Sequence, residues 1–109
     1  MGLDIDIKRK RQETCPHCGK VTGYKVIACE ESGGRAWYPF LESIGYYVPY
    51  DQRTEENDWY CKDMTLTDAQ VKELYQFLKK TEMYQGSAIK NMVAKALLEN
   101  DIIVVNANW

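Results

Sequence analysis

Cys15-Pro16-His17-Cys18-Gly19 is the stretch that decides how this chain folds. Two cysteines separated by two residues, with Gly directly after the second, have the form of a zinc knuckle, a tight turn that presents two sulfur ligands. Leu3, Ile5 and Ile7 precede the turn and alternate with charged residues, which is the period of a strand with one apolar face. A second strand is expected over residues 23–29. We therefore predict that the knuckle connects two antiparallel strands.

The later part of the chain predicts helices and one more strand. The clearest helix starts after Thr67, because Thr67 and Gln70 form a capping box ahead of an apolar stripe at helical spacing. We expect this helix to end near Tyr84, and we expect Ser87 to cap the next one. The other predicted elements are a short helix over residues 36–44, a loop over 32–34, a charged loop over 51–58, a strand or extended return over 59–61, a helix over 88–99, and a buried strand over 102–105.

These elements predict an α+β fold in a single domain spanning residues 1–109. A small antiparallel sheet carries the knuckle at one end, and two C-terminal helices pack on one face of the sheet. The strand over residues 102–105 is expected to pair with the strand over residues 3–7. Trp37, Phe40 and Trp59 are expected in the core.

Composition excludes several classes of protein. The net charge of −2 gives no general attraction to nucleic acid or to anionic membranes. No run of about 18 apolar residues is present, so no membrane-spanning helix is expected. Charges in the first eleven residues take the place of the apolar block of a signal peptide. We therefore expect a cytoplasmic protein, in which cysteines act as metal ligands or free thiols rather than disulfides.

The four cysteines are the candidate ligands of a structural Zn²⁺ ion. Cys15 and Cys18 supply two ligands, and Cys29 and Cys61 are the expected third and fourth. The alternative is that Cys29 and Cys61 are small buried apolar residues. With four ligands, the metal would tie the first third of the chain to the segment around Trp59, and Cys15→Ser would release metal and lower thermal stability sharply. His17, within the knuckle, is expected to be an exposed loop residue.

Two other functions are compatible with the knuckle. Basic residues near it could contact a phosphate backbone, with Trp37 and Tyr38 available for stacking on a base. Alternatively, Cys-Pro-His-Cys is a dithiol motif of thioredoxin-fold oxidoreductases, although the residues after it are a poor start for a helix. No signature of hydrolytic catalysis is present. The candidate nucleic-acid contacts are Lys8, Arg9, Lys10, Arg11 and Lys20.

The N-terminal third resembles a group of small bacteriophage and prophage proteins. They begin Met-Gly-Leu-Asp, as this chain does, and contain a short knuckle. The resemblance implies a phage or mobile-element origin and a setting inside the host cell, and it implies no particular activity. The knuckle also resembles that of zinc-ribbon proteins, which have a second Cys-x-x-Cys pair where this chain has the single Cys29 and Cys61.

The sequence as a whole predicts a small, zinc-stabilised, non-enzymatic binding protein. The expected partner is a host protein, which a phage accessory factor would engage. A nucleic-acid-binding zinc protein is the alternative, and a dithiol oxidoreductase is a third possibility.

Overall fold

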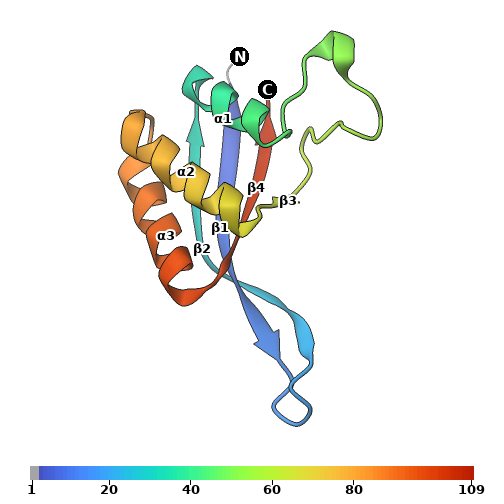
Figure 1. The fold of residues 1–109 in the computed structure, drawn as a ribbon, viewed down its shortest axis with the longest axis vertical. Coiled ribbons are helices and arrows are strands. Elements are labelled where there is room, and N and C mark those ends of the chain that lie inside the picture. The colour runs from blue at the N-terminus through green and yellow to red at the C-terminus, as the bar shows by residue number, and fades with distance from the viewer. Residues whose placement is uncertain (1–2) are drawn as a thin grey trace.

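The computed structural model describes residues 3–109 and confirms the α+β fold class. Met1 and Gly2, the first half of the Met-Gly-Leu-Asp opening, lie outside the described residues. Four strands form one antiparallel sheet in the order β2-β1-β4-β3, and helices cover one of its faces (Figure 1). The elements are β1 (Asp4–Thr14), β2 (Val21–Gly33), the 3₁₀ turn η1 (Arg35–Trp37), α1 (Tyr38–Ser43), the 3₁₀ turn η2 (Tyr50–Gln52), β3 (Met64–Thr65), α2 (Asp68–Lys80), α3 (Gly86–Glu99) and β4 (Ile102–Asn108).

The predicted hairpin is present and is longer than the sequence suggested. β1 and β2 pair from Asp4↔Gly33 to Thr14↔Val21, and the knuckle connects them. The outer part of this hairpin, residues 10–26, extends beyond the rest of the sheet, and we call it the arm (Figure 1). The arm contributes to a molecule with principal extents of 49 × 33 × 23 Å.

Two irregularities in pairing shape the arm. Arg9 pairs with Ala28 and Lys10 pairs with Val26, so Ile27 is an extra residue in β2. A second extra residue lies in β2 near the turn, between the partners of Glu13 and Thr14. Bulges of this kind bend a strand pair and increase its twist. The first bulge therefore lies where the arm departs from the sheet.

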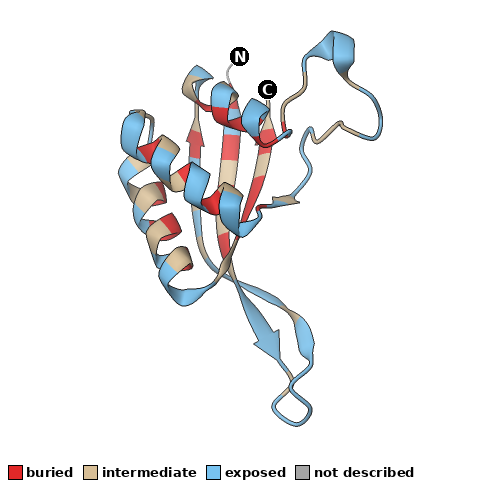
Figure 2. Ribbon diagram, viewed as in Figure 1, coloured by how far each residue is buried: buried red, intermediate tan, exposed pale blue. Residues whose placement is uncertain are grey.

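The core lies between the sheet and the helices (Figure 2). Ile5 and Ile7 of β1 point into it, as their alternation with charged residues predicts. β4 contributes Ile103 and Val105, and it pairs with β1 as expected. Trp37 and Phe40 are buried as predicted, whereas Trp59 is only partly buried. Nearly all of the arm is exposed in Figure 2.

The helices follow their local sequence signals. The capping box at Thr67 is formed, with the Gln70 N–H donating to Thr67 Oγ1 at 3.2 Å and the Thr67 N–H donating to Gln70 Oε1 at 2.9 Å. α3 ends at Asn100, which adopts the left-handed conformation that asparagine tolerates. The Asp101 N–H then donates to the Ala96 carbonyl, which fixes the backbone of Asp101 directly before β4.

Several predicted boundaries were wrong. α2 ends at Lys80 rather than near Tyr84, because the chain turns extended at Thr81. Gln85, not Ser87, caps α3. Residues 32 and 33 belong to β2 rather than to a loop, since the hairpin pairing continues through them. Residues 60 and 61 form a turn, and the short strand that pairs with β4 lies later, at Met64–Thr65.

Candidate functional site

The knuckle lies at the free end of the arm and is held by backbone hydrogen bonds. The Cys15 N–H donates to the Lys20 carbonyl and the Gly19 N–H donates to the Cys15 carbonyl, each at 2.8 Å. Gly19 has φ +72°, a conformation that glycine adopts without strain. These bonds close the turn and keep Cys15 and Cys18 on one tight loop.

Hydrogen-bond donors of the turn point toward the sulfur of Cys15. The backbone N–H groups of Cys18 and His17, and the Cys18 thiol, hydrogen-bond to Cys15 and lower its pKa. A lower pKa favours the thiolate, which is the form that binds a metal. The turn therefore favours the thiolate form of Cys15.

Cys29 lies far from the knuckle. It pairs with Lys8, six residues along β1 from the last pair of the hairpin at Thr14. At about 3.3 Å per residue, this separation is about 20 Å. The Cys29 side chain is exposed on the sheet surface. Its partial removal from water, followed by the negative charge of Asp6, raises the pKa of its thiol. A raised pKa disfavours the thiolate that zinc requires.

Cys61 is farther still from the knuckle. Its N–H donates to the Ala107 carbonyl at 2.9 Å, and Ala107 pairs with Ile5. Ile5 is nine residues from Thr14, which corresponds to about 30 Å along the strand. Cys61 is exposed and has φ +58°. Neither Cys29 nor Cys61 is a buried apolar residue, as the alternative interpretation proposed.

The structure thus brings together Cys15 and Cys18 but not the four cysteines. Within residues 3–109, no group of three or more His, Cys, Asp or Glu side chains lies close enough to hold a metal ion. His17 is exposed, as expected, and adds no third ligand to the pair. A metal at the knuckle also lies away from Trp59, so it cannot tie the first third of the chain to that segment.

The candidate basic residues are divided between two faces of β1. Arg9 and Arg11 point to the side of the helices, where both pair with Glu99 and Asp101. Lys8 and Lys10 alternate with them and so point to the uncovered side. Two of the five predicted cations are therefore neutralised, and Lys20 stands alone at the end of the arm.

The sequence interpretation missed an apolar stripe along β2 of the arm. Val21, Tyr24 and Val26 pair with Thr14, Gln12 and Lys10, which are alternate residues of β1. The three side chains therefore share one face, and they are 52%, 50% and 47% exposed. We call them the stripe. Simple alternation would place Val21 and Tyr24 on opposite faces, and only the bulge near the turn aligns them.

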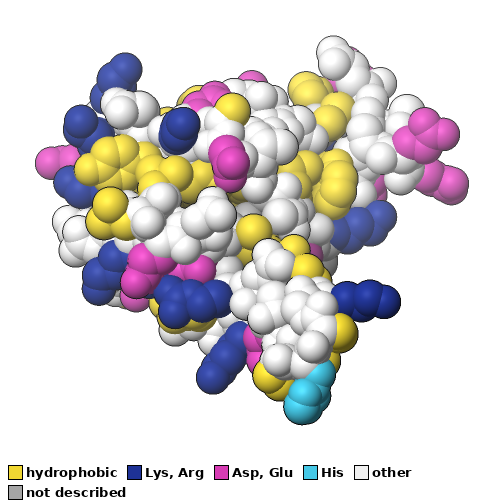
Figure 3. Space-filling view, turned by 60° about the horizontal axis from the view of Figure 1, so that its bottom comes forward, with side chains coloured by type: hydrophobic (Ala, Val, Ile, Leu, Met, Phe, Trp, Pro, Cys, Tyr) yellow, Lys and Arg dark blue, Asp and Glu magenta, His cyan; other side chains and the backbone are white. Residues whose placement is uncertain are grey.

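The end of the arm combines apolar and basic side chains on one small surface (Figure 3). Ile27, the extra residue of the first bulge, is 38% exposed at its base. A shallow groove at this bulge is lined by Arg11, Gln12, Glu13, Lys25, Val26 and Ile27. β2 is also an edge strand of the sheet, with β1 as its one neighbour. The arm therefore offers both apolar side chains and a free strand edge.

Aromatic rings surround Arg53 in the charged loop over residues 51–58. The guanidinium of Arg53 lies over the rings of Trp109, Tyr47 and Tyr50, at 5.3, 5.9 and 6.0 Å from their centroids. Its Nη2 and Nε also donate to the Val48 carbonyl. These contacts hold the loop at Arg53, while Tyr50 stays 86% exposed.

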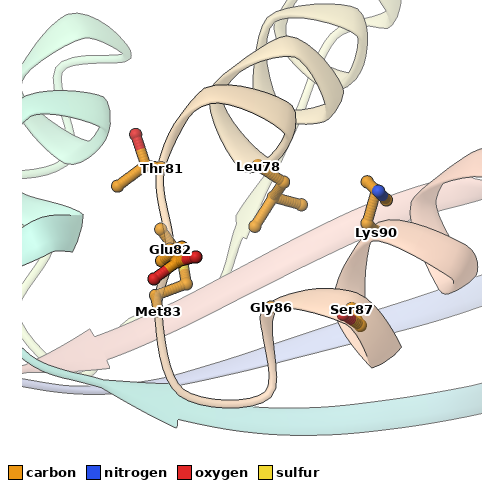
Figure 4. A pocket seen from close by; sticks show the side chains of 7 residues that line it. All are labelled: Leu78, Thr81, Glu82, Met83, Gly86, Ser87 and Lys90. Carbon is orange, nitrogen blue, oxygen red and sulfur yellow. The ribbon is translucent and has the colours of Figure 1, made fainter.

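A pocket of about 320 Å³ lies between the end of α2 and the start of α3 (Figure 4). Leu78 and Met83 form its apolar part, and Glu82, Ser87 and Lys90 are its polar lining. None of the three polar side chains is joined to another by an ion pair, and no metal-ligand cluster is present among these residues.

Comparisons with known proteins identify no relative. No family model, curated protein or solved structure matches this chain. No helix within residues 3–109 is long and apolar enough to span a membrane.

Proposed function

We propose that this chain is a small, non-enzymatic binding protein that carries zinc at Cys15 and Cys18 and engages a protein partner through the stripe. The observation that supports this proposal best is the exposure of Val21, Tyr24 and Val26 on an arm that extends beyond the core. No second layer covers these side chains, so contact with a partner would remove apolar surface from water.

The free edge of β2 supports the same proposal. An exposed edge strand presents unpaired N–H and C=O groups that a partner strand can satisfy. Proteins use this pairing for recognition, with main-chain hydrogen bonds giving affinity and side-chain contacts giving specificity. In the arm, the stripe would supply those side-chain contacts. The resemblance to phage and prophage proteins favours a host protein in the host cytoplasm, which makes this chain a phage accessory factor.

The test compares capture of host proteins by three forms of the chain. We expect the wild type to retain a specific host protein from lysate, and the double variant Tyr24→Lys/Val26→Lys to lose it. Leu98→Lys is the matched control, because Leu98 is a fully solvated residue of α3, 86% exposed. Recovery of the same protein by the arm variant, or loss of it in the control, would contradict the role of the stripe.

Zinc binding has its own test. Protein purified without chelator should contain zinc, and Cys15→Ser should not. The local geometry supports this expectation, since two backbone N–H groups approach the Cys15 sulfur. Metal-free wild-type protein obtained under zinc-replete, reducing conditions would contradict it.

The alternatives have less support from the geometry. Ion pairs occupy Arg9 and Arg11, so Lys8, Lys10 and Lys20 are the candidate cations that remain for a phosphate backbone. We expect no salt-dependent mobility shift with DNA or RNA at two salt concentrations. The dithiol lies in a β-turn rather than at the start of a helix, so we expect no insulin-reducing activity.

A further inference from the structure

We propose that a second copy of this chain completes the zinc site, so that Cys15 and Cys18 from two copies bind one Zn²⁺ ion between two arms. This inference rests on zinc binding at the knuckle and goes beyond it by naming the source of the missing ligands. It does not depend on the partner of the stripe.

A zinc ion needs more ligands than one copy of this chain brings together. A closed structural zinc site takes four ligands in a tetrahedron. The knuckle supplies two sulfurs, and no further His, Cys, Asp or Glu side chain joins them within residues 3–109. Cys29 lies six residue pairs from the turn end of the hairpin, and Cys61 lies beside Ala107 near the C-terminal end of β4. One chain therefore offers half of the required ligand set.

The position of the knuckle allows a second copy to approach. The knuckle lies at the free end of the arm, away from the helices and from the core (Figure 1). Two-fold symmetry brings the same surface of both copies together, so each chain contributes the same two sulfurs. The result is four thiolates in two symmetry-related pairs, which is a complete ligand set without any other protein.

The charges of the arm suit this arrangement. One Zn²⁺ with four thiolates carries a net charge of −2. Within the arm, the basic residues Lys10, Arg11, Lys20 and Lys25 outnumber the one acid, Glu13, and Arg11 is paired with Glu99 and Asp101. Each arm is therefore net positive, which is opposite in sign to the metal centre. The backbone of Lys20 lies beside the knuckle, because its carbonyl accepts the Cys15 N–H.

The geometry of the stripe is compatible with a dimer joined at the knuckles. Tyr24 and Val26 of the stripe lie behind the turn along β2, and they stay exposed when only the ends of the arms meet. A dimer would carry two stripes and so bind a repeated or dimeric partner with increased avidity. Metal binding would then determine how many stripes one assembly presents, and it would leave the fold of each copy unchanged.

The experiment titrates cobalt(II) into reduced, metal-free protein while absorbance and molar mass are recorded. We expect saturation at one metal per two chains, with the spectrum of tetrahedral four-sulfur coordination. Light scattering after size exclusion should show a twofold rise in molar mass from 12.7 kDa. EDTA should return the protein to monomer. Cys18→Ser should remain monomeric, whereas Cys29→Ser and Cys61→Ser should behave as the wild type.

Each other outcome overturns the inference in a distinguishable way. Saturation at one metal per chain with unchanged molar mass would show zinc binding without the second copy. Loss of the dimer in Cys29→Ser or Cys61→Ser would assign the missing ligands to this chain instead. A dimer that persists in EDTA and in Cys18→Ser would arise without metal. Absence of cobalt binding would also reject zinc binding at the knuckle, on which the inference rests.

Discussion

Arg9 Nε donates to Asp101 Oδ2 at 2.6 Å, and only 7% and 2% of these two side chains are exposed. The pair joins β1, just before the arm begins, to the connection between α3 and β4. Arg11 adds two hydrogen bonds to the same carboxylate, and Glu99 accepts from both arginines. Hydrogen bonding by Arg11, followed by that of Arg9, lowers the pKa of Asp101. This network anchors the base of the arm to the helical layer.

Asp101→Asn should destabilise the protein by about 2 kcal/mol at neutral pH, because it removes the buried carboxylate that two arginines share and leaves exposed Glu99 as their remaining acidic partner. The lowered pKa of Asp101 adds stability that is fully present above its ordinary value near 3.8 and is lost as pH falls through the folded value. Urea unfolding at several pH values should therefore show less acid sensitivity in this range in the variant. Glu99→Gln, at an exposed position, is the milder control. Equal acid sensitivity of wild type and Asp101→Asn would refute the assignment.

Gly33→Ala should destabilise the edge of the sheet. A Cβ at Gly33 would lie 2.5 Å from the Leu3 carbonyl oxygen, and a backbone atom cannot swing aside as a flexible side chain can. Steric crowding of this kind costs about 1–3 kcal/mol. Thermal unfolding should show the loss, with the exposed neighbour Glu31→Ala as control. Wild-type stability in Gly33→Ala would mean that β1 and β2 separate here at little cost.

Ser32→Ala should lower stability by about 1–3 kcal/mol, the cost of buried polar groups left unpaired. Ser32 Oγ accepts from Trp37 Nε1 at 2.9 Å and donates to the Tyr84 carbonyl. The hydroxyl thereby joins β2, η1 and the α2–α3 connection. Chemical denaturation should detect the change, and Trp37 fluorescence should shift as its indole loses its partner. Ser43→Ala, which removes a hydroxyl from an exposed position, should have little effect on either signal.

Tyr46→Phe should loosen the long connection between α1 and β3. The Tyr46 hydroxyl accepts from the Ala107 N–H at 2.8 Å and donates to the Lys62 carbonyl at 2.6 Å. Without it, the buried N–H of β4 has no partner, at a cost of about 1–3 kcal/mol. Hydrogen exchange should accelerate at Ala107 more than at Ile103. Tyr60→Phe is the control at an exposed ring, and unchanged exchange in Tyr46→Phe would exclude this role.

Removal of metal should leave the core folded. The knuckle lies beyond the packed region, so EDTA should preserve the far-UV circular dichroism, and Cys15→Ser should melt with the wild type in EDTA. Ile7→Ala is the contrasting variant, because loss of a buried isoleucine costs about 2–5 kcal/mol. This expectation replaces the one from sequence, in which the metal tied the N-terminal third to Trp59. If EDTA unfolds the wild type, the metal stabilises the fold as the sequence predicted.

Local signals in the sequence were sufficient for much of the fold. The alternation of Ile5 and Ile7 with charged residues predicted β1, and the capping box at Thr67 predicted the start of α2. The knuckle correctly predicted a connection between antiparallel strands. Each of these features depends on residues that are neighbours in sequence, so their side-chain types and spacing contain the necessary information.

The tertiary structure decided which distant residues meet. Cys29 and Cys61 were predicted as zinc ligands from their residue type, but strand register places them about 20–30 Å from the knuckle. Sequence also grouped Arg9 and Arg11 with the other cations, whereas folding pairs them with Asp101, some 90 residues away. Two bulges shift the faces of β2, and one of them aligns Val21 with Tyr24. The amino-acid sequence by itself therefore determined the elements and the two-sulfur turn. Register and packing, which depend on contacts between remote segments, determined that only Cys15 and Cys18 of the four cysteines lie together.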